Sequence, residues 1–267
     1  MKKSIIFSIS SDIGYNLSLK LLEENHTIYG TYNTYSDNVK KLKELGVKLF
    51  KCNLLEDNEI SETINLIKQY CSHWDNLFIL QASMNPIGLL EKTNMIDWEK
   101  SIKLNFINQI KIIKELLDTR NLEITPSVIT FAGGGTNNAT KNFSAYTISK
   151  ISLIKMMELL YAEYSNVKFT CIGPGWVKTK IHEETIQAKN NALEAYNETV
   201  KHLDADDFTK MDEVIKCLLW IIKSKKEIVS GRNFSVTHDK WGTKELEKEL
   251  EKNSNMYKLR REGNQWK

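Results

Sequence analysis

Tyr146 and Lys150 stand four residues apart in a segment, residues 143–150, that has the pattern of a helix. Residues four apart share a helix face, so an ammonium group can lie beside a phenol and lower its pKa from about 10. Such a pair can transfer protons. The alternative is that both are ordinary residues of a helix surface.

The same spacing recurs at Tyr164 and Lys168. The interval between them has the pattern of a helix end that runs into a strand over residues 167–172, so these two side chains need not share a face. Only the pair at 146 and 150 is expected to act together.

The chain that positions this pair has 267 residues, of which 41% are hydrophobic. This length and composition favour one domain with one large core. The net charge of +3 comes from 37 basic and 34 acidic residues spread along the chain, which argues against a nucleic-acid partner.

No run approaches the roughly 18–20 apolar residues that span a bilayer, and the short apolar start favours a first strand over a signal peptide. Four scattered cysteines show neither metal-type spacing nor a disulfide framework, and a cytoplasmic setting is expected: Cys52, Cys71, Cys171 and Cys217.

Short apolar runs alternate with helical patterns up to about residue 236. The expected strands are 4–8, 27–32, 47–50, 76–81, 127–131, 167–172 and 228–236. The expected helices are 13–24, 37–45, 58–70, 98–117, 144–164 and 212–222. This repeated strand–helix order predicts an α/β fold, a single Rossmann-type domain over residues 1–242 with a doubly wound parallel sheet of about seven strands.

Two segments lie outside this alternation. Residues 179–210 form a long polar insertion after the sixth strand, where a substrate lid would lie because ligands of open α/β sheets bind at the strand carboxyl ends. An ordinary pair of surface helices is the alternative. Residues 243–267 are predicted to form a charged, solvated helix and tail.

The turn after the first strand reads Ser8-Ile-Ser-Ser-Asp-Ile-Gly14, a run of small residues that ends in glycine at a helix start. Free backbone N–H groups and the helix dipole favour an anion there, such as a cofactor phosphate.

This turn, the Tyr-x-x-x-Lys pair and a Pro-Gly-x-x-x-Thr loop at 174–179 have the order and spacing of the short-chain dehydrogenase/reductases, which the chain resembles over about residues 1–240. Ser8 and Asp12 replace two glycines of that family's Thr-Gly-x-x-x-Gly-x-Gly turn, and Gly14 is kept. Residues 80–83 fall at its Asn-Asn-Ala-Gly segment, and Asn105 matches the asparagine of its central helix.

The resemblance implies three catalytic residues. Tyr146 would protonate a carbonyl oxygen as hydride arrives, or take the proton in the reverse direction. Lys150 would lower the pKa of Tyr146 and hold the nicotinamide ribose hydroxyls, and Asn105 would hold a water that relays protons to Lys150. The cofactor itself carries the redox chemistry.

The resemblance also implies a nicotinamide cofactor. Its binding residues would be Ser8, Ser10, Ser11, Asp12, Ile13, Gly14, Tyr32, Asn53, Leu54, Ala82, Ser83, Tyr146, Lys150, Pro174, Gly175, Val177 and Thr179. The second strand ends without the acidic residue that favours NAD, which favours NADP. A basic partner for the 2′-phosphate is not evident either, so NAD remains open.

One partner of the tyrosine is not in its usual place. The family has a serine about 13 residues before the tyrosine, and this chain has Gly133 there, next to Ala132. Losing one such donor typically costs ~10²–10³-fold in turnover. Thr136 or Ser144 could replace it, or the glycine-rich turn could present backbone N–H groups or make room for a bulky substrate.

Four residues are candidate substrate contacts, namely Gly133, Gly134, Trp176 and His182. No metal site is expected, because the remaining histidines lack mutual spacing suited to a metal and fit surface or loop positions.

The function expected from these features is NAD(P)-dependent interconversion of a carbonyl and a secondary alcohol on a small molecule. A sugar of bacterial surface-polysaccharide synthesis is suggested by a resemblance of residues 131–146 and 255–261 to one bacterial subgroup of the family. The alternative is a catalytically impaired relative that binds cofactor or has a structural role. A homodimer or homotetramer is expected through the helices that carry Tyr146 and Asn105.

Overall fold

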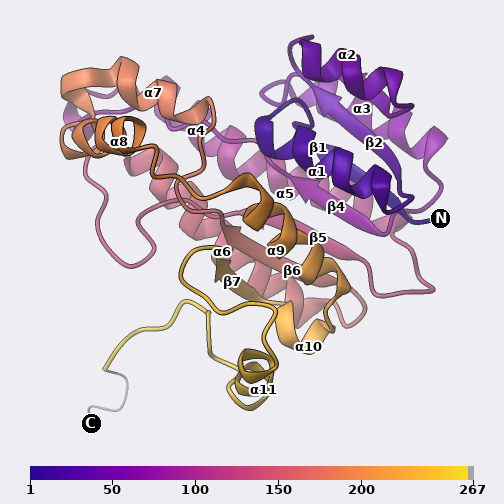
Figure 1. Ribbon diagram of the computed structural model, residues 1–267. Coiled ribbons are helices and arrows are strands. Elements are labelled where there is room, and N and C mark those ends of the chain that lie inside the picture. Colours follow the sequence, from indigo (N-terminus) through magenta and orange to yellow (C-terminus); the bar gives the residue numbers. More distant parts are fainter. Residues whose placement is uncertain (264–267) are drawn as a thin grey trace.

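The computed structural model describes residues 1–263 and has seven parallel strands in the order β3-β2-β1-β4-β5-β6-β7 (Figure 1). The strands are β1 Lys3–Phe7, β2 Thr27–Tyr32, β3 Lys48–Lys51, β4 Asn76–Ile79, β5 Ser127–Phe131, β6 Lys168–Gly173 and β7 Arg232–Ser235. This is the doubly wound Rossmann-type sheet that the alternation of strands and helices predicts.

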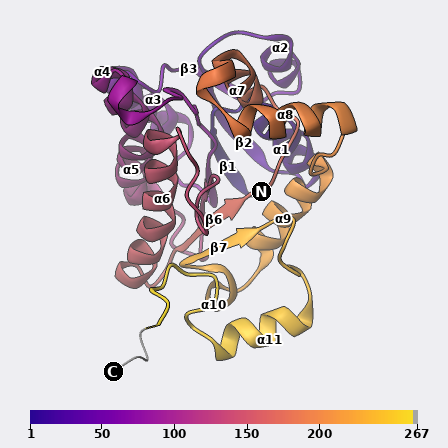
Figure 2. The same ribbon diagram turned by 90° about the vertical axis from the view of Figure 1, so that its left-hand side faces the viewer.

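Helices cover both faces of this sheet, as the view in Figure 2 shows. The α-helices are α1 Asp12–Glu23, α2 Asp37–Glu44, α3 Asp57–Tyr70, α4 Met95–Ile102, α5 Asn108–Leu116, α6 Ser144–Glu163, α7 Ile181–Ala188, α8 Glu194–Ala205, α9 Met211–Lys223, α10 Lys226–Val229 and α11 Lys244–Lys252. Short 3₁₀ turns lie at η1 Leu90–Lys92, η3 Leu117–Thr119 and η4 Lys189–Asn191, and a π-helical turn lies at η2 Lys103–Ile107.

The core has two halves, one on each face of the sheet. One half packs α3, α5 and α6 against residues such as Ile5 and Leu77, and the other packs α1, α2 and α9 against residues such as Ile6 and Phe78. Neighbouring strand residues face opposite sides, and both sides are buried, so the strands are nearly continuous apolar runs. Tight packing on both faces fixes the strand ends that carry the site.

Two predicted elements differ from the structure. The helix expected over 98–117 begins at Met95 and is interrupted by the η2 π-turn. The strand expected over 228–236 is shorter, because Lys226–Val229 forms a helical turn and Gly231 has a positive φ of 73° that redirects the chain into β7.

The charged helix near the C-terminus is docked rather than solvated on all sides. α11 buries Leu246 and Leu250 against the body. The guanidinium of Arg232, on β7, donates to the carbonyl of Leu250 at 2.7 Å and to the carbonyls of Asn253 and Met256 beyond it. The backbone N–H of Asn233 also donates to the carbonyl of Tyr257 at 2.9 Å.

The second Tyr-x-x-x-Lys pair is divided between two elements, as expected. Tyr164 is the residue at which α6 ends, and Lys168 begins β6. The ammonium group of Lys168 donates to the carbonyls of Ile222 and Ser224, which gives it a structural role. Among residues 1–263, no helix is long and apolar enough to cross a membrane.

Candidate functional site

The predicted site residues come from loops and helix starts at the carboxyl ends of the strands. In a parallel sheet all the carboxyl ends lie on the same side. The turns after β1, β3, β4 and β6 supply residues 8–14, 53–54, 82–83 and 174–179, and Tyr32 ends β2. α6 follows β5 and carries Tyr146 and Lys150. The fold therefore gathers segments that are far apart in the sequence.

The turn after β1 is built for close approach to the start of α1. Ser8 has a positive φ of 62°, a conformation that favours glycine, and its N–H donates to Thr31 Oγ1 at 3.1 Å. Ser11 caps the helix by accepting from the N–H of Gly14 at 3.1 Å. A Cβ on Gly14 would lie 2.8 Å from the carbonyl oxygens of Ser8 and Ile9, so only glycine fits there.

Tyr32 at the end of β2, and Asn53 and Leu54 after β3, are three more of the predicted cofactor-binding residues. Tyr32 packs edge-on against Tyr35 with ring centroids 6.0 Å apart. The side-chain oxygen of Asn53 accepts from the N–H of Leu55 at 3.1 Å, so the Asn53 amide is partly engaged in its own turn. The carbonyl of Leu54 accepts from Asn108 of α5.

Asn105 lies in the η2 π-turn and is fully buried. Its Oδ1 accepts from the N–H of Ser83 at 3.0 Å, and its Nδ2 donates to the carbonyl of Ser83 at 2.8 Å and to Ser101 Oγ at 3.1 Å. This two-way pairing fixes the loop after β4. The widened turn that carries Asn105 had no recognisable signal in the sequence.

Tyr146 and Lys150 share a face of α6, and the Lys150 Nζ lies 5.8 Å from the centre of the Tyr146 ring. Nζ is buried and has no hydrogen-bond partner among the described residues. Burial lowers the pKa of Lys150 to about 8, against an opposing effect of the nearby Cys171. The ammonium group thus has unused donors aimed within the site.

The pKa of Tyr146 departs from the sequence-based expectation. Burial raises the pKa of the phenol, and the charges of Glu184 and Cys171 raise it further. The lowering expected from Lys150 is not found, because a buried phenol loses the water that would stabilise its anion.

Gly133 lies directly against the ring of Tyr146. A Cβ at this position would lie 2.6 Å from both Cε1 and the hydroxyl oxygen of Tyr146. The ring therefore fills the space into which a side chain at 133 would project. Gly134 is exposed, and a Cβ there would meet nothing closer than Thr140 Oγ1 at 3.8 Å.

Of the two residues considered as replacements for the serine, Ser144 is engaged elsewhere. Its Oγ accepts from the indole N–H of Trp98, on α4, at 3.0 Å. Thr136 is half-buried in the loop between β5 and α6.

The loop after β6 meets the insertion at an aromatic cluster. Trp176 stacks between His182 of α7 and His202 of α8, with ring centroids 4.9 and 4.5 Å apart. His182 Nε2 lies 3.0 Å from the carbonyl of Val177, while burial and the charge of His202 lower the pKa of His182. His202, expected at an ordinary surface or loop position, instead helps hold α8 to this loop.

Two further contacts tie the insertion to the strand ends. The backbone N–H of Lys180 donates to Asp12 Oδ2 at 3.4 Å. Glu184, on α7, accepts hydrogen bonds from the loop after β4, about 100 residues earlier in the sequence. Sequence reasoning missed Glu184, because a half-exposed glutamate in a polar helix gives no local signal.

The residues present fit a nicotinamide cofactor. The tight turn at Gly14 brings the free N–H groups of α1 to its surface, where they can bind a pyrophosphate. The Lys150 Nζ, which has no partner in the described part of the chain, can bind ribose hydroxyls. Among residues 1–263, no group of three or more His, Cys, Asp or Glu side chains is arranged to hold a metal.

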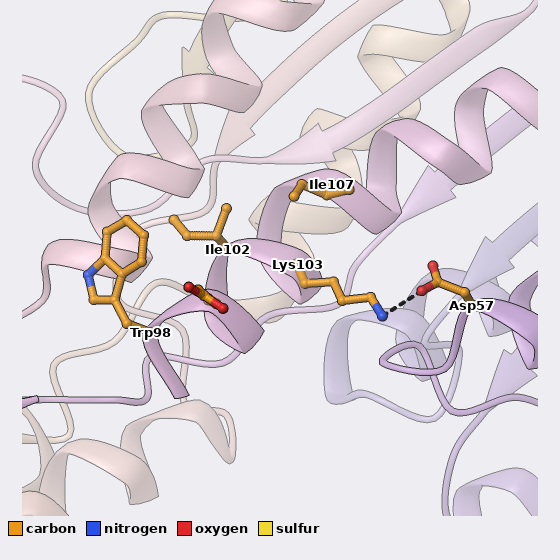
Figure 3. A pocket seen from close by; sticks show the side chains of 6 residues that line it. Asp57, Trp98, Ile102, Lys103 and Ile107 are labelled. Atoms are coloured by element: carbon orange, nitrogen blue, oxygen red, sulfur yellow. Dashed lines mark ion pairs between the residues drawn. The ribbon is translucent and has the colours of Figure 1, made fainter. Parts of the chain in front are cut away.

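A hollow of about 410 Å³ lies elsewhere, beside α4 and η2 (Figure 3). Its labelled residues include Trp98, Ile102 and Ile107, and its edge carries an ion pair between Lys103 and Asp57 at 2.6 Å. None of the predicted site residues lines it.

Comparisons with known proteins identify a family and a fold. A family model described as enoyl-(acyl carrier protein) reductase matches residues 9–238. A short-chain dehydrogenase/reductase of Penicillium canescens, olcF, is 20% identical over 250 residues, covering 90% of this chain and 96% of the relative.

Solved structures share the fold. A short-chain dehydrogenase/reductase from Saccharomyces cerevisiae superposes with a TM-score of 0.77 at 18% identity, covering 92% of this chain and 98% of that chain. A variant of the actinorhodin polyketide ketoreductase, solved with NADPH, gives 0.75 at 16% identity, covering 88% of this chain and 95% of that chain.

Proposed function

Because the chain belongs to the short-chain dehydrogenase/reductase family, we propose that it interconverts a carbonyl and a secondary alcohol on a small molecule with a nicotinamide cofactor. The observation that carries this proposal is that α6 and η2 bring Tyr146, Lys150 and Asn105 to the carboxyl ends of the strands, where the Lys150 Nζ is buried without a hydrogen-bond partner among residues 1–263.

The cofactor supplies or accepts the hydride. Tyr146 donates its phenolic proton to the carbonyl oxygen in reduction and takes it back in oxidation. Lys150 binds the ribose hydroxyls and holds its positive charge near the phenol, where it favours the phenolate. Asn105 fixes the loop after β4 and holds the water of the proton relay. Gly133 contributes no side chain, so a backbone N–H of the glycine-rich turn supplies the remaining hydrogen bond to the substrate.

NADP is the favoured cofactor. β2 ends in Tyr32 and is followed by Asn33 and Thr34, so no carboxylate repels a 2′-phosphate there. The NADPH bound to the actinorhodin ketoreductase, a protein of the same fold, is consistent with this preference.

A polyhydroxylated substrate such as a sugar is supported by a second cavity. It has a volume of about 400 Å³ and adjoins the lid segment 181–205, which α7 and α8 form. Its lining combines apolar residues such as Pro86 and Ile87 with the amides of Asn142, Asn190 and Asn191. Amide groups both donate to and accept from hydroxyls.

A second copy of the chain is the proposed partner. α6 and the η2 turn expose large apolar side chains, with Ile107 and Ile148 each 51% and Leu159 47% exposed. Burying these faces between copies would remove them from water and stabilise a dimer or tetramer. Light scattering at micromolar concentration checks this, and a monomer would contradict it.

Titration with NADPH and with NADH tests cofactor binding, with the melting temperature of the protein as the readout. A real site gives saturable stabilisation that rises as RT ln(1 + [L]/Kd), larger for NADPH. A panel of ketones and keto-sugars then tests turnover. Tyr146→Phe should keep the binding and lose turnover by ~10²–10⁴-fold.

A cofactor-binding relative without turnover is the second candidate, favoured by Gly133 in place of a serine. Saturable binding together with no turnover on the whole panel would support it. Failure to bind either cofactor would contradict both candidates.

A further inference from the structure

The loop after β4 forms an anion-binding turn. Three donors converge on one point: the hydroxyl of Ser83 at 3.1 Å, the backbone N–H of Met84 at 2.6 Å and the backbone N–H of Asn85 at 3.1 Å. Successive N–H groups that point together make a concave site for an anion. We call these three residues the 83–85 turn.

The chain fills this turn with its own carboxylate. All three donors bind the same atom, Glu184 Oε2, which reaches them from α7 of the lid segment. The other oxygen, Oε1, makes no hydrogen bond with the described residues. Charge-assisted hydrogen bonds of this kind are about twice as strong as neutral ones, so they hold α7 to the loop.

This contact lies beside the predicted site residues. Ser83 hydrogen-bonds to the Asn105 side chain through both the N–H and the carbonyl of Ser83. The charge of Glu184 also reaches the phenol of Tyr146, whose pKa it helps to raise. The cavity of about 400 Å³ begins at Pro86, the residue directly after the turn.

We propose that Glu184 determines the charge of the substrate: its carboxylate occupies the 83–85 turn, and the closed site therefore accepts carbonyl compounds without an acidic group. A substrate carboxylate would meet a like charge, and the donors that could bind it are already taken. Without Glu184, the same turn would be free to bind a carboxylate. This inference rests on the proposed function for turnover, but the turn itself can be tested by binding.

The test uses two compounds of nearly equal shape, acetoacetamide and acetoacetate, with the full-length protein saturated with cofactor. The natural chain should turn over the amide with at least a tenfold higher kcat/KM. Glu184→Ala should lower that ratio by about tenfold or more, because it vacates the donors and removes the repelling charge. Glu184→Gln, which keeps the shape, should shift the pH profile of kcat to lower pH as the phenol becomes more acidic.

Glu183→Gln is the matched control, because Glu183 neighbours Glu184 on α7 but is exposed and makes no hydrogen bond to the 83–85 turn. It should leave the ratio unchanged. An equal effect of both changes would show that general charge, and not the 83–85 turn, sets the preference, and would overturn the proposal.

Binding separates this inference from the proposed reaction. Calorimetry should detect acetoacetate binding at least tenfold tighter to Glu184→Ala than to the natural chain. Tighter binding without any turnover would support the turn while the proposed reaction fails. Turnover with equal acetoacetate affinity in both proteins would refute the turn and leave the reaction standing.

Discussion

The phenol of Tyr146 lies where a side chain at Gly133 would begin, with a Cβ on Gly133 placed 2.6 Å from the phenolic oxygen. Glycine at 133 is therefore matched to this position of the tyrosine. The ring occupies the space that a side chain at position 133 would need.

A serine at position 133 should consequently destabilise the protein. Gly133→Ser forces the ring of Tyr146 aside, and overpacking of this kind costs ~1–3 kcal/mol. We expect a lower melting temperature and at least ~10-fold lower turnover, measured by calorimetry and steady-state kinetics. Gly134→Ser is the control for stability, since a Cβ there has room. Higher activity in Gly133→Ser would contradict the packing described for Tyr146.

Burial of Lys150 should lower the free energy of unfolding at neutral pH. Its pKa falls to about 8 in the folded chain, so the unfolded chain binds more protons between about pH 8 and 10.5, and stability rises with pH across that window. Lys150→Met should therefore abolish turnover yet stabilise the protein at neutral pH by on the order of 3 kcal/mol. The gain should shrink as the pH rises towards 10.5.

Lys168 offers a comparison for that measurement. Burial lowers its pKa to about 8 as well, but its ammonium group donates to two carbonyls. Lys168→Met should give less stabilisation than Lys150→Met or destabilise the chain, because it leaves acceptors unpaired. Denaturant unfolding over a series of pH values measures the free energy of unfolding of both variants. Equal effects would contradict the view that the Lys150 Nζ, unlike that of Lys168, lacks hydrogen-bond partners.

Acid should loosen the lid segment through His182. Burial lowers the pKa of His182, so this side chain binds its proton less tightly in the packed segment than in an unfolded one, and stability is lost as the pH falls below about 6.5. Amide exchange over residues 181–205, corrected for its intrinsic rate, should show less protection at about pH 5.5 than at about pH 7.5. His182→Phe keeps the stack on Trp176 and should remove this dependence.

The exposed His238 serves as the control for the lid experiment. His238→Phe should retain the full loss of protection in acid. If His182→Phe behaves like His238→Phe, another group must open the segment.

The topology was predictable from the sequence because each strand is an apolar run flanked by helical patterns, as in residues 127–131. The placement of Tyr146 beside Lys150 was predictable because four-residue spacing determines a shared face within α6. Both inferences depend only on local periodicity.

Long-range contacts were not predictable in this way. The π-turn at Asn105, the fit of Gly133 to Tyr146 and the reach of Glu184 to the loop after β4 depend on where distant backbone segments meet. The raised pKa of Tyr146 has the same origin, because burial is a property of the whole fold.

The docking of the C-terminal segment has a consequence for self-association. β7 is the last strand of the sheet, and an open strand edge can pair with another molecule. Here one N–H group of β7 donates to the carbonyl of Tyr257. The Arg232 side chain donates to three carbonyls of the C-terminal segment and so holds that segment against β7. At the opposite edge, β3 is four residues long with exposed Lys48 and Lys51 at its ends. The C-terminal backbone therefore covers part of the edge strand β7, and lysine charges flank the edge strand β3. Both features disfavour aggregation through strand addition.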